Sequence, residues 1–323
     1  MVISHGDEDH AKGLIPILND KHVVVKSIYH NGIVARKKGK RLGEFQKVDG
    51  KNMLTELVDD LSRYEDHLED LTDEYRLWIE AVIAARENAL AEGLDFKCMR
   101  ADHLSEPIIV GDDYPVTVNF VNPINHGDES NPLLRKWSDD AVTVNANSVG
   151  MLLEYNKARI LLCGDMNRSA ENQFVEKWKD KSPQAHIFKA HHHGSQDFSN
   201  TFLKRVQPWI SVVSSGDDPD YGHPRANLLG SLGKFSSQII DQPLIFSTEL
   251  AATFHMIDPI PGSEDAQLYE KTIQGVISVR SNGEWLAAGR VYKKSKDVPR
   301  RWEWEKYALD LTCGKELGND LNT

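Results

Sequence analysis

The chain begins with a cluster of potential metal ligands directly after a short apolar run. The first residues read MVISHGDEDHAKG, and four potential metal ligands lie within six positions: His5, Asp7, Asp9 and His10. Ligands of both types suit zinc, manganese or iron, and together they suit a dinuclear site. If residues 1–4 form a strand and 12–19 a helix, the cluster lies at the carboxyl end of a strand. Open α/β folds place their chemistry there.

An acidic, histidine-containing loop after a strand is more often a solvated turn or a helix N-terminus than a metal site. The first thirteen residues therefore do not decide between these alternatives. The decision depends on whether the rest of the chain supplies further ligands in a similar setting.

The composition is that of an ordinary globular protein. The chain has 323 residues, of which 40% are hydrophobic and 27% charged, enough for one large domain or two small ones. No apolar run reaches membrane-spanning length, and the N-terminus lacks the pattern of a signal peptide. The three cysteines, Cys98, Cys163 and Cys313, are widely spaced and form no CxxC pair. We therefore expect a cytoplasmic protein with no membrane partner and no disulfide framework.

The net charge of −11 gives no sign of the broad basic surface of a high-affinity duplex binder. This charge does not exclude a nuclease, because divalent metals reverse the local charge at an acidic site and attract a phosphodiester.

Strand patterns alternate with helical patterns along most of the chain. The strand patterns lie at 22–30, 107–110, 116–121, 148–155, 159–163, 185–190, 210–214, 275–280 and 284–291. The helical patterns lie at 12–19, 52–92, 170–179 and 202–206. This alternation predicts an α/β sandwich with its chemistry at strand ends.

We expect one domain over residues 1–323, with a helical insertion at about 50–95 that stops at Gly93 and a C-terminal tail at about 293–323. The tail, which contains Trp302 and Trp304, is expected to pack on the sheet. The basic stretch at 36–41 is either a solvated loop or a contact for a phosphate backbone.

Three further segments repeat the arrangement of the opening cluster. The apolar run at 160–163 leads into Gly164 and Asp165, the run at 185–190 leads into three histidines and a serine at 191–195, and His223 follows a third strand pattern. Alone, a strand-terminal aspartate is often a turn residue, and a single histidine is often structural. Three consecutive histidines after a strand are hard to explain by packing.

This order of motifs resembles the metallo-β-lactamase superfamily, whose members carry a His-x-His-x-Asp-His motif, a later Gly-Asp and further histidines. The resemblance is strongest to the soluble hydrolase domain of ComEC-type DNA-uptake proteins, which have Asp in place of the second His, as Asp7 is here. The other motifs that carry it are Asn145-x-x-Ser148, Leu162-Cys163-Gly164-Asp165, Lys189-Ala190-His191-His192-His193-Gly194-Ser195 and Tyr221-Gly222-His223-Pro224. The resemblance covers residues 1–290 apart from the insertion and implies an αββα sandwich.

The resemblance also implies a centre of two divalent ions, zinc or manganese. Asp165 would bridge the ions, His5 and Asp7 would hold one of them, and the other ligands would hold the second: Asp9, His10 and His193, with His192 as the alternative to His193. Two such ions lower the pKa of a bridging water and clamp the attacking and leaving oxygens.

Three residues are assigned to catalysis by the same resemblance. Asp9 would orient the hydroxide, while His192 and His223 would contact the scissile phosphate or protonate the leaving group. Ser195 is a weaker candidate for a hydrogen bond to the phosphate.

The chain departs from the family pattern in two respects. Family members have two or more strands before the first ligand motif, whereas Met1 stands almost on it here. We expect an incomplete first half-sheet with an exposed edge, left by truncation or covered by a partner chain or a second copy. The usual third histidine of the first metal site is also missing, and Asn145, His126 or water would take its place.

The leading hypothesis is a metal-dependent phosphodiesterase or nuclease that acts on a phosphodiester substrate such as single-stranded DNA or RNA. A second hydrolase hypothesis keeps the metals and changes the substrate to a lactone, thioester or β-lactam. A third is a truncated, non-catalytic domain that binds metal or a partner.

Overall fold

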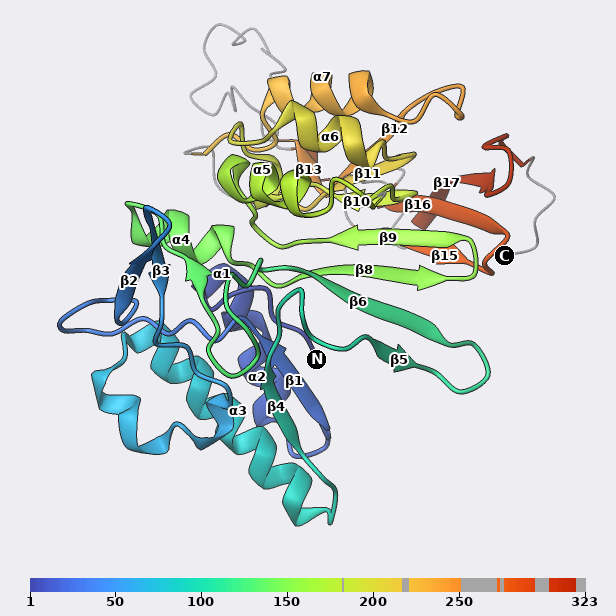
Figure 1. The fold of residues 1–323 in the computed structure, drawn as a ribbon. Helices are drawn as coiled ribbons and strands as arrows, with labels where there is room; N and C mark the ends of the chain where they lie inside the picture. The colour runs from blue at the N-terminus through green and yellow to red at the C-terminus, as the bar shows by residue number, and fades with distance from the viewer. Residues whose placement is uncertain (182, 217–220, 251–271, 274–275, 294–301, 318–323) are drawn as a thin grey trace, which may run out of the picture. The chain divides into compact units, whose positions relative to one another are not determined.

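The computed structural model describes residues 1–181, 183–216, 221–250, 272–273, 276–293 and 302–317 (Figure 1). The chain divides into two compact units. Unit 1 comprises Met1–Val110, Thr117–Leu152 and Cys163–Lys177. Unit 2 comprises Gly111–Val116, Leu153–Leu162 and Trp178–Thr323.

Unit 1 contains short helices, one long helix and several short strands. In chain order its elements are α1 (Glu8–Ala11), η1 (Lys12–Leu14), α2 (Ile15–Asn19), β1 (Ser27–His30), β2 (Phe45–Val48), β3 (Lys51–Leu54), η2 (Leu61–Arg63), η3 (Glu65–Asp70), α3 (Asp73–Ala91), β4 (Lys97–Arg100), β5 (Ile108–Val110), β6 (Val116–Asn122), β7 (Leu134–Arg135), α4 (Asp140–Ala146), the start of β8 (Gly150–Tyr155) and α5 (Arg168–Lys177). The η elements are single 3-10 turns or short 3-10 helices.

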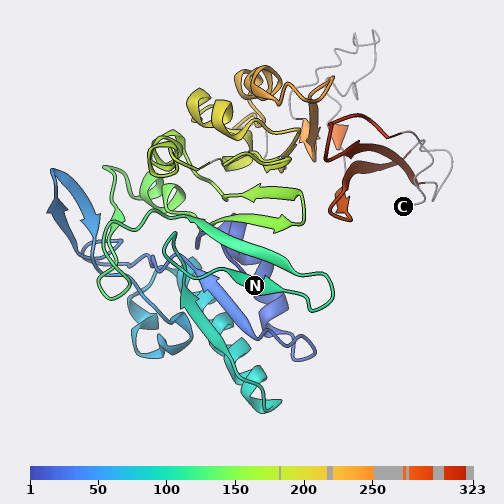
Figure 2. The same cartoon turned by 45° about the vertical axis from the view of Figure 1, so that its right-hand side comes forward.

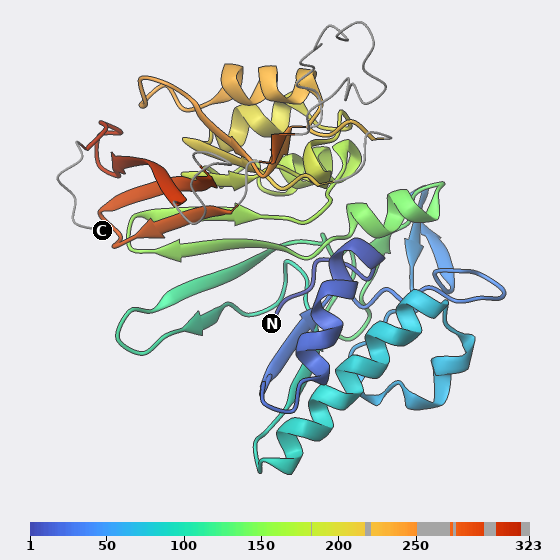
Figure 3. The same cartoon turned by 180° about the vertical axis from the view of Figure 1, so that it is seen from behind.

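The core of unit 1 forms where α2 and α3 cover the parallel pair of β1 and β4 (Figure 3). Helix α3 buries Trp78, Ile79 and Val82 on one face, as its helical spacing predicts. Ile28 of β1 and Leu18 of α2 are fully buried in the same cluster. Gly93 ends the helix as expected, with φ of 70° and its N–H bonded to the carbonyl of Leu90.

The N-terminal strand patterns are only partly formed. The strand expected at 1–4 is reduced to a single parallel bridge between Val2 and Tyr29. The buried strand expected at 22–30 is limited to β1, because Val23 and Val24 are exposed. Hydrophobic residue type alone did not distinguish these exposed valines from core residues.

The helical pattern at 52–92 is wrong at its start. Strand β3 pairs with β2 and with β7 in a three-stranded antiparallel sheet, which contains the blue hairpin of Figure 2. The turn between β2 and β3 is Asp49-Gly50, and both residues have positive φ. An Asp-Gly pair is a strong hairpin signal, and its tight turn directs residues 51–54 into a strand.

A seven-stranded sheet supplies strands to both units. Unit 1 holds β5, all but the first residue of β6 and the start of β8. The second part, β12-β11-β10-β9, belongs to unit 2 together with the end of β8. The strands of the second part are β9 (Ala158–Leu162), β10 (Ile187–Lys189), β11 (Ile210–Val213) and β12 (Leu244–Ser247), all paired in parallel. Their apolar residues are mostly buried, as expected of parallel strands.

The remaining elements of unit 2 are η4 (His192–Gly194), α6 (Asn200–Val206), α7 (Ala226–Phe235), β13 (Glu249–Leu250), β14 (Thr272–Ile273), β15 (Ile277–Ser281), β16 (Trp285–Lys293) and β17 (Trp302–Asp310). Strands β15, β16 and β17 form an antiparallel sheet. The tail expected to pack on a sheet thus supplies a strand of its own, paired with β16.

The architecture is mixed α/β, as the alternation of strand and helix patterns predicts. Among the described residues, no helix combines the length and the apolar character needed to cross a membrane.

Candidate metal centre

His5 and Asp7 lie on the loop that leads from the Val2 bridge into α1. Backbone bonds fix this loop at two points: Ile3 N–H donates to the carbonyl of Tyr29 at 3.0 Å, and Val149 N–H donates to that of Ser4 at 2.7 Å. The His5 side chain is 1% exposed, and its Nε2 lies 3.6 Å from Asp7 Oδ2. The opening cluster is therefore positioned by hydrogen bonds to β1 and to the start of β8.

Asp9, His10 and Asp165 form a second group within unit 1. His10 Nε2 lies 3.5 Å from Asp9 Oδ2 and 3.2 Å from Asp165 Oδ2. Each of the three residues offers one ligand atom, and these three atoms lie within 4.8 Å of one another. Asp165 is 3% exposed, whereas the Asp9 side chain is 60% exposed. The group therefore has one buried carboxylate and one that faces solvent.

Two serine hydroxyls connect the groups. Ser4 Oγ lies 3.1 Å from the Nδ1 atoms of both His5 and His10, whose ring centroids are 4.2 Å apart. Ser148 Oγ lies 3.3 Å from His5 Nδ1, accepts the Asp165 N–H at 3.1 Å and donates to the carbonyl of Asn145 at 2.8 Å. The Ser148 hydroxyl thus contacts both His5 and Asp165.

The Ser148 hydroxyl gives its proton to the carbonyl of Asn145, so toward His5 it can only accept, and the tautomer of His5 with the proton on Nδ1 satisfies it. In that tautomer Nε2 carries the lone pair. That lone pair faces the carboxylate of Asp7. Metal-binding histidines characteristically donate their other ring N–H to an oxygen in this way.

Gly164 lets the Asp165 loop approach the Ser4 and Ser148 segments. Its φ is +53°, and a Cβ there would lie 2.5 Å from Ser4 Cβ and 3.0 Å from Ser148 Cβ. Only glycine tolerates both the conformation and the contact. Gly6 is similarly close to the ring of Tyr75, at 2.6 Å from a built Cβ.

The carboxylates of the centre repel one another. Burial, and after it the charges of Asp9 and Asp165, raise the pKa of Asp7 to about 6, although the charge of His10 acts in the opposite direction. Burial, with the charge of Asp7 next, also raises the pKa of the Tyr75 hydroxyl. A divalent cation among these groups would remove the repulsion, so the donor set fits a metal that prefers imidazole and carboxylate ligands.

The two protein candidates for the missing third ligand lie in different surroundings. Asn145 lies in the last turn of α4, where its carbonyl accepts from Ser148 Oγ, and its buried Oδ1 makes no hydrogen bond within the described part of the chain. His126 lies 2.7 Å from Gln173 Nε2 and lines a cavity whose lining residues include none of the cluster above. The structure therefore favours Asn145 over His126 for this position.

His192, His193 and His223 gather in unit 2. The ring centroid of His192 lies 6.4 Å from that of His193 and 6.1 Å from that of His223. His193 Nδ1 lies 2.9 Å from the carbonyl oxygen of Ser214, so it donates there and its Nε2 has the ligand lone pair. His192 and His193 both have positive φ, at 47° and 52°. Such conformations cluster at functional sites.

The two other polar residues of this motif have structural roles. His191 is 5% exposed and packs against Phe188 and Phe202, with ring centroids 4.9 and 5.0 Å away. Ser195 Oγ accepts the N–H of Asp197 at 3.2 Å. The predicted catalytic and ligand assignments of residues 192, 193 and 223 remain predictions.

Sequence patterns did not identify the serine that links both histidines. Ser4 has no distinctive spacing, and its role depends on the fold of the loop around it. Ser148 belongs to the Asn145-x-x-Ser148 motif, but the motif does not predict that its hydroxyl contacts both His5 and Asp165.

Comparison with known proteins finds a distant similarity over part of the chain. No protein-family model matches the chain. ComE operon protein 3 of Bacillus subtilis (strain 168) is 24% identical over 109 residues, which are 33% of this chain and 14% of that protein. The chain is therefore similar to a short segment of this relative.

Proposed function

We propose that this chain is a metal-dependent hydrolase that cleaves a phosphodiester. The observation that carries the proposal is the convergence of five ligand side chains in unit 1, arranged as a pair and a group of three joined by the Ser4 hydroxyl. The similarity to ComE operon protein 3 supports the resemblance to ComEC-type hydrolase domains. The HHGS-type motif at 192–195, like that of the superfamily's phosphoesterases, favours a phosphodiester substrate.

In this proposal, His5 and Asp7 would hold one divalent ion, Asp9 and His10 would hold a second, and Asp165 would lie between them. When bound, the ions lower the pKa of water and neutralise charge on the phosphodiester. The chain's own residues orient the site: Ser4 and Ser148 fix the imidazoles through Nδ1.

Unit 2 contributes three histidines to the proposal. His193, whose Nδ1 is fixed by Ser214, is the proposed further ligand. His192 and His223 are proposed to bind the scissile phosphate and to deliver a proton to the leaving oxygen, which suits imidazole near neutral pH. Asp9, the solvent-facing carboxylate, is proposed to orient the attacking water.

The direct test is hydrolysis of bis-p-nitrophenyl phosphate and of a single-stranded oligonucleotide, with manganese or zinc supplied. We expect activity in the wild-type chain and its loss in Asp165→Asn. Glu8→Gln is the matched control, because Glu8 lies between the ligand residues in sequence but pairs with Lys12. The control should retain activity.

Other outcomes would reject the proposal in distinct ways. Turnover of nitrocefin or a lactone alone would identify a hydrolase with another substrate class. Metal binding without any hydrolysis would identify a non-catalytic metal-binding domain.

A further inference from the structure

Unit 1 contains a second site that none of the proposed metal ligands line. It is a cavity of about 780 Å³ bordered by β3, β7, α5 and the loops at 103–104 and 124–127. This volume falls within the range of ligand-binding pockets. Its fully ionised side chains are three cations, Lys51, Arg135 and Lys177, and one carboxylate, Glu176. The cavity is thus cationic in a chain whose net charge is −11.

The hairpin fold brings two of the cations together. Met53 of β3 stands opposite Arg135 of β7, and side chains two residues apart on a strand share a face. Lys51 and Arg135 are therefore diagonal neighbours on one face of the sheet. Lys47 stands opposite Asn52 and so lies on the other face of the same hairpin.

The three cations lack an ion-pair partner within the part of the chain that the structure describes. Within the described ranges, no ion pair includes Lys51, Arg135 or Lys177. Arg135 Nη1 is buried and donates no hydrogen bond in that part of the chain. A buried guanidinium N–H that lacks an acceptor is costly, and a phosphate oxygen would satisfy it in the forked geometry that arginine favours.

Two histidines that line the cavity have their pKa values lowered by burial and by the cations of the same lining. Burial lowers the pKa of His126, and Lys51, Arg135 and Lys177 lower it further. Burial, followed by the charge of Lys177, lowers the pKa of His103 to about 4. Both rings are therefore hydrogen-bonding groups rather than additional cations at neutral pH.

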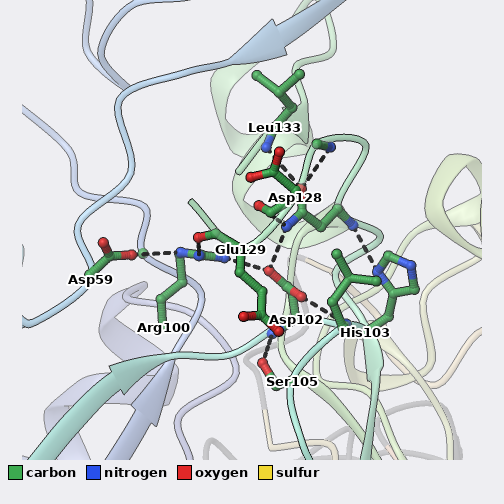
Figure 4. Close-up of polar contacts among 12 residues, drawn as sticks. Asp59, Arg100, Asp102, His103, Ser105, Asp128, Glu129 and Leu133 are labelled. Carbon is green, nitrogen blue, oxygen red and sulfur yellow. Dashed lines mark hydrogen bonds and ion pairs between the residues drawn. The ribbon is translucent and has the colours of Figure 1, made fainter. Parts of the chain in front are cut away.

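A polar network holds the loop that carries His103. Arg100 lies between Asp59 and the buried Asp102, and Ser105 bonds to the backbone of Asp102 (Figure 4). Asn125 bonds Asp102 through its amide and His103 Nδ1 through its backbone N–H, at 2.9 and 3.0 Å. His103 is thus fixed with Nε2 as its donor.

The remaining lining suits a nucleic-acid strand. Trp137 offers an aromatic ring, with the Arg135 guanidinium 6.0 Å from its centroid, and bases stack on such rings. Ser169, Asn172, Gln173, Glu176 and Lys177 line the cavity from one face of α5. Ser169 is four residues beyond Asp165. From 169 to 177 the helix rises about 12 Å, about the length of three stacked nucleotides.

We propose that this cavity binds the backbone phosphates and one stacked base of a single-stranded nucleic acid, as a substrate-strand subsite of unit 1. The assignment rests on the proposed phosphodiesterase function for its purpose. Its binding chemistry needs no metal, so the two proposals can fail separately.

The test is fluorescence anisotropy of a fluorescein-labelled twelve-nucleotide oligothymidylate with the full chain, in buffer with EDTA. We expect Arg135→Gln/Lys177→Gln to weaken binding at least ~10-fold at low salt and to reduce the slope of log K against log[salt] by about 1.4, or ~0.7 per lost phosphate contact. Trp137→Ala should weaken binding at least ~5-fold. Lys47→Gln, on the other face of the hairpin, should bind like the wild type.

Lys177→Gln alone keeps the test independent of folding, because this side chain is exposed on α5. It should weaken binding with an unchanged melting temperature. The proposal is overturned if the wild type does not bind the oligonucleotide, if the double variant binds as tightly as the wild type, or if Lys47→Gln weakens binding equally. Binding of thymidine monophosphate without the oligonucleotide would also overturn it, in favour of a free-nucleotide site. Tight oligonucleotide binding without hydrolysis would support this inference and reject the proposed function alone.

Discussion

His10 Nε2 lies 3.2 Å from Asp165 Oδ2, although the two residues are 155 positions apart in the chain. Asp9 Oδ2 lies 3.5 Å from the same nitrogen. This relationship joins the opening cluster to the Gly-Asp motif and makes the cluster a candidate metal centre rather than a solvated turn.

The first prediction concerns Asp165, the buried carboxylate of this group. Asp165→Asn keeps the side-chain shape and removes the charge, so metal-supported hydrolysis of bis-p-nitrophenyl phosphate should fall at least ~100-fold. Steady-state kinetics with the Glu8→Gln control measures this. Equal activities of the wild type and Asp165→Asn would show that the group does not support the reaction.

The second prediction concerns the hydroxyl shared by His5 and Asp165. Ser148→Ala removes one of the two hydroxyls beside His5 Nδ1 and the acceptor of the Asp165 N–H, so metal affinity should fall ~10- to 100-fold. Isothermal titration calorimetry measures it. Ser62→Ala is the control, because this buried serine bonds Asp60 instead. An unchanged metal affinity in Ser148→Ala would show that the Ser148 hydroxyl does not support metal binding.

The third prediction concerns Gly164. Gly164→Ala combines a positive φ with a Cβ 2.5 Å from that of Ser4. Gly93→Ala also has a positive φ, of 70°, but its Cβ would meet nothing within 4 Å. In urea unfolding, Gly164→Ala should lower the free energy of unfolding by ~1–3 kcal/mol more than Gly93→Ala does. Equal decreases in the free energy of unfolding would show that the loop at Gly164 shifts to make room for the added Cβ.

The fourth prediction concerns pH and the buried His30. Burial, then the charge of Arg100, lowers its pKa from 6.5 to about 3. Between these values the unfolded chain binds a proton that the folded chain does not, so stability is lost as the pH falls below 6.5.

His30→Asn should reduce this loss, because Asn Oδ1 can accept the Gly32 N–H that His30 Nδ1 accepts. The slope of unfolding free energy against pH should fall by up to ~1.4 kcal/mol per pH unit between pH 6 and 4. Urea unfolding across this range measures the slope. Parallel curves for the variant and the wild type would exclude His30 as a source of acid sensitivity.

Sequence patterns predicted the parts of the fold that depend on local periodicity. Strands β6 and β9 lie within a few residues of their patterns, and helix α3 occupies the second half of the helical pattern at 52–92, because their apolar spacing matches the faces they bury. The pattern failed at Lys51–Leu54, where an Asp-Gly turn overrides helical spacing. It also failed at Val23 and Val24, which are exposed.

The candidate site also contains some residues that the sequence predicts and others that it does not. His5, Asp7, Asp9, His10 and Asp165 were named because ligand types cluster at strand ends. The linking hydroxyl of Ser4 and the cavity cations Lys51, Arg135 and Lys177 could not be named, because only tertiary pairing brings them together.

The most direct test of the metal centre is calorimetric titration of the chelator-treated chain with manganese and with zinc, beside Asp165→Asn. The account predicts about two divalent ions bound per wild-type chain, with lower affinity or stoichiometry in the variant. A wild-type chain that binds neither metal, or a variant that binds both as the wild type does, would contradict it.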